Sequence, residues 1–554
     1  MTNWRISPSP IPMEQIYETH DCEVLVIGLG PSGTAAFRAS AEAGAKTIAI
    51  DIQPESKYRV MGHNIGHINS QFLEHRGVPK VDEIEFFNDW MLRSGNRANP
   101  SLVMKFVKNS GSAFDWFTDG FSYDKMDETV VVGFWPSERI HRQLGGYKFW
   151  VGTATFQMRY GPGGKTGPTL EDISEDCHKK ARALGSETYF GMEAMQLVKK
   201  KGRVIGAIAK NSNGNYVYFH ASRGVILASG DFSANKEMLD ELCVDMADIC
   251  KKKHRYISVA GPRSNGRGIQ MGVWAGGRLE ARPLPTMGGN YSSVHATSEN
   301  SYILLLDSEG KRYCNEGLGD VVFTGFPGNQ MRGGRRYHIF DSGLLEDVSV
   351  QAPSHGNFDA SSHIFSGTIE RTMQSAVDAI PKGIEKKGAL PGSGATGPVQ
   401  VDGKAKDRSP GIFAGNTIEE LCDHAGISGT VQRNIIASFN RYNELASKGK
   451  DEDFGKDACI LRPLNKAPYF LEEFDNANLG FMLVTVGGLL TDENQNVLDE
   501  DYIQIPGLYA TGNCCGRRFG LQYSTPIAGV SLGIAITLGR EVGKVAAMAD
   551  IESE

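Results

Sequence analysis

The clearest pattern of hydrophobic and polar positions begins at Cys22, in the stretch CEVLVIGLGPSGTAAFRASAEAGAKTIAID. An apolar run typical of a buried strand is followed by a glycine turn, an amphipathic helix and a second apolar strand. Near the end, IPGLYATG is again typical of a buried strand, and a glycine-rich turn and the long apolar stretch SLGIAITLGREVGKVAA follow it. Strands that alternate with helices predict an α/β fold with a parallel sheet.

The first turn has the chemistry of a dinucleotide site. Gly28 permits the sharp turn, Gly30 lets a pyrophosphate approach the backbone, and Gly33 lets helix and strand pack closely. The pyrophosphate is then expected at the helix N-terminus, where N–H groups and the helix dipole favour an anion. Asp51 ends the second strand, where it can hydrogen-bond the ribose hydroxyls. A GxGxxG alone is weak evidence, but here it has the required strand, helix and acid; it does not separate FAD from NAD.

Composition narrows the class of protein. A chain of 554 residues predicts two or three packed units, and its 40% hydrophobic and 22% charged residues are ordinary for a soluble protein. The net charge of −7 gives no basic surface for nucleic acid or anionic lipid, so we expect a small-molecule partner. No apolar run reaches about 18 residues, and the start MTNWRISPSPIPMEQ lacks the layout of a signal peptide. We therefore expect a cytoplasmic protein with no membrane partner.

The nine cysteines are scattered along the chain. The one adjacent pair, Cys514 and Cys515, has no ligand-spaced Cys or His elsewhere. We expect buried, reduced thiols, with neither a disulfide framework nor a metal site.

A family resemblance becomes specific after the first helix. RGVILASGDFSAN, residues 223–235, resembles the "VVLATGGFSxN" segment of the fumarate reductase and succinate dehydrogenase flavoprotein superfamily, which includes 3-ketosteroid dehydrogenases. Further similar segments follow in the expected order over nearly the whole chain: GRVIGAI (202–208), SNGRGIQMGVWAGG (264–277), DSEGKRYCNEG (307–317), GNTIEEL (415–421), VGGLLTDENQNVL (486–498) and IPGLYATGNCCG (505–516).

The resemblance implies an architecture and a cofactor. We expect a discontinuous, Rossmann-like FAD domain of the GR2 type, formed by residues 20–294 and 483–546, an inserted α+β cap over 295–482, and an N-terminal extension over 1–19. The FAD is expected to be non-covalent, because Asn64 stands where membrane-bound members carry a flavin-linked His. His63 and His67 are expected to be polar side chains satisfied against the cofactor. The full predicted FAD set is Gly28, Gly30, Pro31, Ser32, Gly33, Asp51, Ile52, Gly62, His63, Asn64, Gly66, His67, Ala228, Ser229, Gly230, Asn265, Gly268, Gly488, Gly512, Asn513, Ser531 and Leu532.

The substrate site departs from the dicarboxylate reductases of the family. Leu284 stands in the place of the "HPT" His, Leu345 in that of the Arg acid, Val484 in that of the "HTMGG" His, and the "RLGGN" Arg falls near Pro526. Dicarboxylates need cations and donors at such places, so these replacements predict an apolar pocket for a steroid or polyphenol ring system.

Hydride chemistry still needs a proton donor or acceptor. Tyr523 in GLQYSTPIAG resembles the tyrosine with which ketosteroid dehydrogenases activate the substrate ketone. The alternative is a packing tyrosine with its hydroxyl on a backbone carbonyl. Tyr291 and Arg332 are further catalytic candidates, as are Tyr302 and His338, each with a structural alternative.

These features predict an FAD-dependent oxidoreductase acting on a C–C bond of a ketosteroid or isoflavonoid-type ring, in the manner of reductases such as tetrahydrodaidzein reductase. A CxxCH haem motif and a second complete dinucleotide fold are missing from the sequence, so we expect a separate electron donor or acceptor. One alternative is a fumarate- or acrylate-type reductase in which the cations that bind the substrate carboxylates are relocated to Arg332, Arg335 and Arg336. Another is a non-catalytic flavin electron carrier or redox sensor. The oligomeric state is not predicted.

Overall fold

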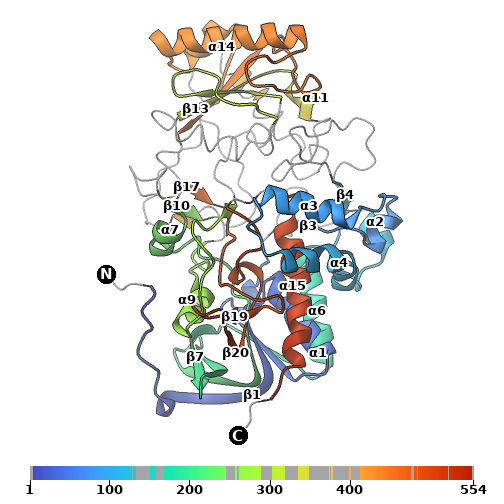
Figure 1. Cartoon of the computed structure of the whole chain (residues 1–554), viewed down its shortest axis with the longest axis vertical. Helices are drawn as coiled ribbons and strands as arrows, with labels where there is room; N and C mark the ends of the chain where they lie inside the picture. Colours follow the sequence, from blue (N-terminus) through green and yellow to red (C-terminus); the bar gives the residue numbers. More distant parts are fainter. Residues whose placement is uncertain are drawn as a thin grey trace.

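The two largest sheets of the computed structural model lie at opposite ends of its long axis (Figure 1). It describes residues 4–60, 62–127, 129–132, 150–156, 167–244, 247, 256–258, 261–287, 302–317, 335–348, 373–374, 376–378, 399–400, 412–475, 480–482, 484–521, 523 and 525–551.

The larger sheet has eight strands and a parallel centre. Its order is β19-β20-β9-β1-β2-β6, and the hairpin β7-β8 pairs with the first half of β9. The pairs β20·β9, β9·β1, β1·β2 and β2·β6 are all parallel. The strand bounds are β1 (Ile16–Ile27), β2 (Thr47–Asp51), β6 (Glu187–Phe190), β7 (Glu193–Lys200), β8 (Arg203–Lys210), β9 (Tyr216–Leu227), β19 (Asn496–Leu498) and β20 (Gln504–Ala510).

Both faces of this sheet are buried, which explains the unbroken apolar runs in the sequence. Val24 and Val26 of β1 belong to one apolar cluster, and Leu25 and Ile27 belong to another, as the two-residue period of a strand requires. The first cluster packs against α1 (Pro31–Glu42), α6 (Leu170–Ala183) and α15 (Val530–Ala547). The second is shared with α3 (Glu83–Arg93), α4 (Pro100–Phe117) and α9 (Arg267–Trp274).

Shorter elements surround the larger sheet. A three-stranded sheet joins β3 (Asn64–Gly66), β5 (Thr153–Thr155) and β4 (Val131–Val132), and β11 (Thr286–Met287) pairs with β18 (Val484–Thr485). A further sheet has the order β14 (Val399–Gln400), β10 (Tyr256–Ser258) and β17 (Gly480–Met482). The other short elements are α2 (Gln71–His75), α5 (Tyr123–Asp127), α7 (Lys236–Leu242), α11 (Leu344–Val348), and the 3-10 helices η1 (Met13–Gln15), η2 (Glu55–Lys57) and η6 (Gly512–Cys514).

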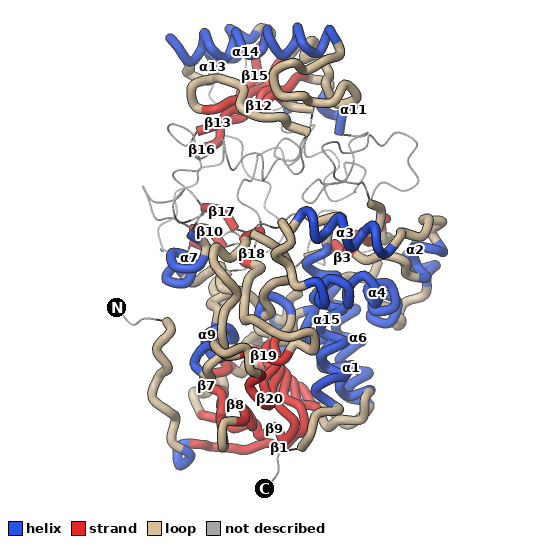
Figure 2. Tube along the Cα trace, viewed as in Figure 1, coloured by secondary structure: helices blue, strands red, loops and turns tan. Residues whose placement is uncertain are grey.

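The smaller sheet is antiparallel, and helices cover one of its faces (Figure 2). Its order is β12 (Leu304–Asp307), β13 (Arg335–Asp341), β16 (Tyr469–Asp475) and β15 (Ile412–Gly415). Helices α13 (Ile418–His424) and α14 (Gly429–Lys448) pack on it through one apolar cluster.

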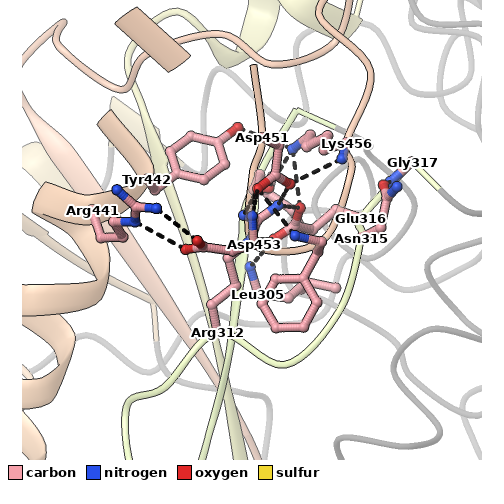
Figure 3. Close-up of polar contacts among 12 residues, drawn as sticks. Leu305, Arg312, Asn315, Glu316, Gly317, Arg441, Tyr442, Asp451, Asp453 and Lys456 are labelled. Atoms are coloured by element: carbon pink, nitrogen blue, oxygen red, sulfur yellow. Dashed lines mark hydrogen bonds and ion pairs between the residues drawn. The ribbon is translucent and has the colours of Figure 1, made fainter. Parts of the chain in front are cut away.

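The smaller sheet and the helices α13 and α14 form a unit that we call the smaller unit. A buried network of charges lies beside β12 in this unit (Figure 3). Arg312 forms ion pairs with Glu316 at 2.8 Å and with Asp451 at 2.7 Å, and Lys456 lies 3.3 Å from Glu316. Burial alone would raise the pKa of Glu316, but Lys456 and Arg312 outweigh it and hold that pKa below its usual value. The network therefore joins β12 to the segment after α14 through charged side chains.

The structure confirms the predicted mixed α/β fold with a parallel sheet. The larger sheet takes strands from 16–227 and 496–510, and the smaller takes them from 304–475; the exact domain boundaries stay predictions. Among the residues that can be placed, no helix combines the length and the apolar character needed to cross a membrane.

Candidate functional site

The predicted glycine turn lies at the end of β1 and has the required geometry. Gly28 has a φ of +101° and donates its N–H to the Ile50 carbonyl at 2.8 Å. A Cβ on Gly33 would lie 1.8 Å from the Gly28 carbonyl oxygen, so no larger residue fits there. At Gly30, by contrast, a Cβ would meet nothing within 4 Å. The turn is thus closed toward the helix and open at the position where a pyrophosphate would lie, with Pro31 as the first residue of α1.

Asp51, the last residue of β2, stabilises this turn. Its carboxylate accepts hydrogen bonds from the Leu29 and Gln53 amides, both at 2.8 Å. Burial raises the pKa of Asp51, and these two hydrogen bonds counteract part of that rise. Each carboxylate oxygen can accept a second hydrogen bond, so the predicted ribose contact remains compatible with the geometry. The neighbouring Ile52 is exposed.

Four predicted segments, far apart in the sequence, meet at one edge of the larger sheet. Residues 28–33, 51–52, 228–230 and 512–513 lie at the carboxyl ends of β1, β2, β9 and β20, which are adjacent parallel strands. Ligands bind outside the carboxyl ends of such strands. The packing is direct: a Cβ on Gly28 would lie 2.6 Å from the Ala228 carbonyl oxygen, and the Ser32 hydroxyl donates to Thr511 at 3.0 Å.

Further predicted residues support this edge. A Cβ on Gly268 would lie 2.2 Å from the Ser229 hydroxyl, and one on Gly488 would lie 2.4 Å from the Cys514 carbonyl oxygen. Asn265 accepts a hydrogen bond from the Arg267 amide at the start of α9. Gly230 and Gly512 have positive φ angles of +89° and +57°.

Partial exposure distinguishes the residues that face the proposed cofactor. Most neighbours in this part of the protein are buried, yet several predicted residues keep exposed surface: Gly28, Gly30, Pro31, Gly62, His63, Asn64, Ser229, Gly230, Asn265, Asn513, Ser531 and Leu532. The Oδ1 atom of Asn64 is buried and has no hydrogen-bond partner among the described residues. An acceptor of this kind implies a missing donor, which fits a polar cofactor such as FAD.

The two histidines of the MGHNIGH segment differ. His67 is fully buried and stacks on Phe114, with ring centroids 3.7 Å apart. Its Nδ1 contacts the Ile65 carbonyl and its Nε2 contacts the Ser70 hydroxyl, which itself accepts from the Leu73 amide. Both ring nitrogens therefore have protein partners, which favours a packing role for His67 over the predicted cofactor contact. His63 is half-buried, and burial lowers its pKa to about 4, so it is neutral near pH 7.

Gly62 and Gly66 allow this segment to pack against α15. A Cβ on Gly62 would meet Leu532 at 2.6 Å, and one on Gly66 would lie 2.5 Å from the Ala528 carbonyl oxygen. The Gly66 amide donates to the Gly529 carbonyl at 2.9 Å.

Tyr523 is fully buried at the start of α15. Its phenol oxygen accepts a hydrogen bond from the Ser531 amide at 2.7 Å, and its ring lies edge-on to Phe519, with centroids 4.7 Å apart. The hydroxyl is thus bound by a backbone N–H, which donates to the phenol oxygen. Because the amide donates to the phenol oxygen, the phenol's own proton is directed elsewhere.

Two of the predicted apolar positions lie in or against the apolar cluster that contains Tyr523. Leu284 is a buried member of it and Val484 packs against it, and Ile527, next to the predicted position Pro526, is a member too. Pro526 is also buried. Tyr291, Arg332 and the side chain of Leu345 lie outside the described residues. Tyr302 is buried, and His338 lies on β13 of the smaller sheet.

Comparison with known proteins decides the family. A model of the FAD binding domain family matches residues 23–532. The chain belongs to that family.

Similar proteins extend over almost its full length. The chain is 23% identical over 551 residues to the vinyl phenol reductase of Lactiplantibacillus plantarum, covering 95% of this chain and 97% of that protein. It is 26% identical over 542 residues to a fumarate reductase (cytochrome) of Shewanella frigidimarina, covering 95% of this chain and 77% of the other. Among solved structures, the 3-ketosteroid-delta4-(5alpha)-dehydrogenase of Rhodococcus jostii RHA1, in complex with 4-androstene-3,17-dione, matches with a TM-score of 0.67 at 20% identity and covers 97% of this chain and 99% of that one.

These findings confirm the predicted family, fold and cofactor. The family member described here binds FAD and is an FAD-dependent oxidoreductase that acts on CH–CH or C=C bonds. It acts on a small-molecule substrate together with a redox partner.

Sequence reasoning missed two buried charged residues of the site, Arg518 and Glu280. Arg518 donates to the Cys515 and Val486 carbonyls and to Asn513 Oδ1, at 2.8 to 2.9 Å. Glu280 accepts from the amides of Gly488 and Arg517, and burial raises its pKa to about 7 despite these bonds. The pair of arginines in CCGRRFG was a signal for Arg518, whereas GRLEARP carries none for Glu280.

Proposed function

We propose that this flavoenzyme transfers hydride between flavin N5 and a carbon of a bulky, mostly apolar and uncharged ring substrate, with Tyr523 as the proton donor or acceptor. The FAD, held non-covalently by the strand-end segments described above, supplies the hydride acceptor and donor. A separate partner supplies or removes the electrons. The observation that carries the proposal is the apolar cluster that holds Tyr523 together with the positions of Leu284 and Val484.

The apolar core to which Tyr523 belongs favours an oxygen-bearing substrate without carboxylates. Leu284, Val484 and Ile527 contribute only hydrocarbon, so they cannot compensate a dicarboxylate. Arg518 is the cation nearest in sequence; its Nε and Nη2 donate to protein acceptors, and only its buried Nη1 has no partner among the described residues. A phenol at the N-terminal end of a helix can instead donate to a ketone or phenol oxygen and exchange its proton there.

The names of two relatives agree with this substrate class. One similar protein is a vinyl phenol reductase, and one similar structure holds 4-androstene-3,17-dione. Both compounds are uncharged rings with one or two oxygens. The dicarboxylate alternative has support from the fumarate reductase match, and Arg335 and Arg336 would be its cations. Arg335 pairs with Glu473 at 3.1 Å, and Arg336 is buried in the smaller sheet.

The test is reoxidation of the reduced enzyme. The flavin is reduced anaerobically, and the return of its oxidised absorbance is followed after mixing with 4-vinylphenol, 4-androstene-3,17-dione, an isoflavonoid or fumarate. Return with a ring compound but not with fumarate is expected. Reoxidation by fumarate alone would overturn the proposal.

Replacing Tyr523 then tests its role. Tyr523→Phe should slow reoxidation by roughly 100-fold or more, the usual contribution of a positioned acid or base, with the FAD content unchanged. Tyr218→Phe is the matched control, since Tyr218 is also buried but lies near the beginning of β9, away from the carboxyl ends of the strands. Equal rates for both variants would remove Tyr523 from the reaction.

A further inference from the structure

The segment that carries Tyr523 is attached to α3 and to the turn that follows it. A Cβ on Gly520 would lie 2.1 Å from the Ser94 carbonyl oxygen, so the two backbones touch. The Asn99 amide donates to the Arg517 carbonyl at 2.6 Å. These contacts fix the first half of the segment, before Tyr523.

A buried ion pair fixes the second half. Arg93 Nε donates to Asp89 Oδ2 at 2.8 Å, and both side chains are 4% exposed. Trp150 Nε1 donates to the same Asp89 oxygen at 2.8 Å. From this position, Arg93 Nη1 donates to the Thr525 carbonyl at 3.2 Å, two residues after Tyr523. Burial of an ion pair costs desolvation free energy, so a buried ion pair stabilises a fold less than apolar side chains of similar size do. Its geometry therefore indicates a positioning role.

Aromatic packing constrains the Tyr523 ring from the same helix. Trp90 of α3 stacks on Phe519, with centroids 6.0 Å apart and an interplanar angle of 14°. Phe519 in turn meets Tyr523 edge-on at an angle of 72°. The ring is thus set by α3 through Phe519, while the backbone after it is set by Arg93.

The contact that these restraints preserve is the hydrogen bond from Ser531. The first amides of a helix have no partner within the helix, and Ser531 is the second residue of α15. Tyr523 supplies that partner through its phenol oxygen.

We propose that Asp89 and Arg93 are positioning residues that hold the phenol oxygen of Tyr523 at the N-terminal end of α15. The catalytic consequence rests on the proposed function of Tyr523, whereas the geometry does not. The two parts are therefore tested by separate measurements.

The geometric part is tested by amide hydrogen exchange at Ser531 in the FAD-bound enzyme. Arg93→Gln should raise the exchange rate at Ser531 by about tenfold, toward the rate in Tyr523→Phe, because the acceptor is no longer held in place. Trp150→Phe removes one donor to Asp89 and keeps the ion pair, so it serves if Arg93→Gln does not fold, with a smaller rise expected. Arg38→Gln is the control, since Arg38 of α1 is equally buried and forms ion pairs with Glu42 and Asp119. Unchanged protection of Ser531 in the Arg93 and Trp150 variants would overturn the proposal.

The catalytic part is tested by a double-mutant cycle on reoxidation by 4-vinylphenol or, if that is not accepted, by 4-androstene-3,17-dione. Arg93→Gln should slow the enzyme by roughly tenfold when Tyr523 is present and leave the rate almost unchanged in the Tyr523→Phe background. The same slowing in both backgrounds would show that Arg93 acts on general stability and would refute the positioning role. If Tyr523→Phe has no effect on rate while exchange at Ser531 still responds to Arg93→Gln, the proposed function fails and the positioning of the phenol stands.

Discussion

The edge of the larger sheet and the interior of the smaller unit are built in opposite ways. At the edge, function depends on backbone groups, and glycines such as Gly28 and Gly33 remove every atom that would keep helix, strand and ligand apart. Beside β12, four charged side chains, those of Arg312, Glu316, Asp451 and Lys456, hold distant segments together without solvent (Figure 3). The first region has no room for a side chain at Gly28 or Gly33, and the second depends on every charge in its network.

The largest effect is expected for Gly33→Ala at the sheet edge. The added Cβ would lie 1.8 Å from the Gly28 carbonyl oxygen, so the turn must open, at a cost above about 4 kcal/mol. We expect protein without FAD and with a lower melting temperature, measured by the ratio of flavin to protein absorbance and by thermal unfolding.

Gly30→Ala sharpens this prediction, because its Cβ meets no protein atom. It should keep the melting temperature of the FAD-free protein and weaken only FAD binding. Wild-type FAD content in Gly33→Ala would contradict the assignment of the turn.

The next largest effect is expected for Glu316→Gln in the smaller unit. The substitution leaves Arg312 and Lys456 buried with only Asp451 to balance them, and breaking such a network costs about 3–5 kcal/mol. Hydrogen exchange of β12 and β13 in the intact enzyme should accelerate accordingly, while exchange in β1 and β2 stays the same. Equal protection of β12 in variant and parent would show that the charges are not coupled to folding there.

Glu280 combines the features of the two regions, because its buried carboxylate is a charged side chain that binds two backbone amides. Its folded pKa of about 7 lies above the ordinary value of 4.5, so its protonation favours the folded state. This stabilisation is complete below about pH 4.5 and is lost as the pH rises to about 7, a change of up to about 3 kcal/mol. Between pH 5 and pH 8 the free energy of unfolding of the parent should therefore fall relative to that of Glu280→Gln, as urea denaturation at several pH values can measure. Parallel pH profiles would refute the raised pKa.

The smallest effect is expected for Asp453→Asn. Its partner Arg441 lies 2.8 Å away, but both side chains are about one-third exposed or more, so solvent screens the pair and its contribution to stability is small. Exchange of α14 should hardly change. A loss as large as that of Glu316→Gln would show that burial does not separate the two pairs.

The sequence predicts the sheet edge better than the rest of the site for a physical reason. Glycine spacing after an apolar strand is a local pattern, so residues 28–33 and 228–230 could be placed from short windows. Glu280 acts through contacts with segments more than 200 residues away, and no local pattern encodes it. Arg518 has a local signal in its arginine pair, but its contact with the Val486 carbonyl appears only in the fold. The role of His67 depended on Ser70 and Phe114, whose positions only the fold reveals. Tyr291 and Arg332 lie outside the described residues, so their catalytic roles stay predictions.

The position of β20 in the larger sheet has a consequence for how the protein is made. This strand, residues 504–510, covers the edge of β9, which is synthesised almost 300 residues earlier. A ribosome must therefore translate the whole smaller unit before the first sheet is complete, and meanwhile the end of β9 presents unpaired backbone groups. The smaller sheet, whose strands all come from residues 304–475, can close first. Until its last segment emerges, the nascent chain therefore exposes a strand end that is able to pair with other chains.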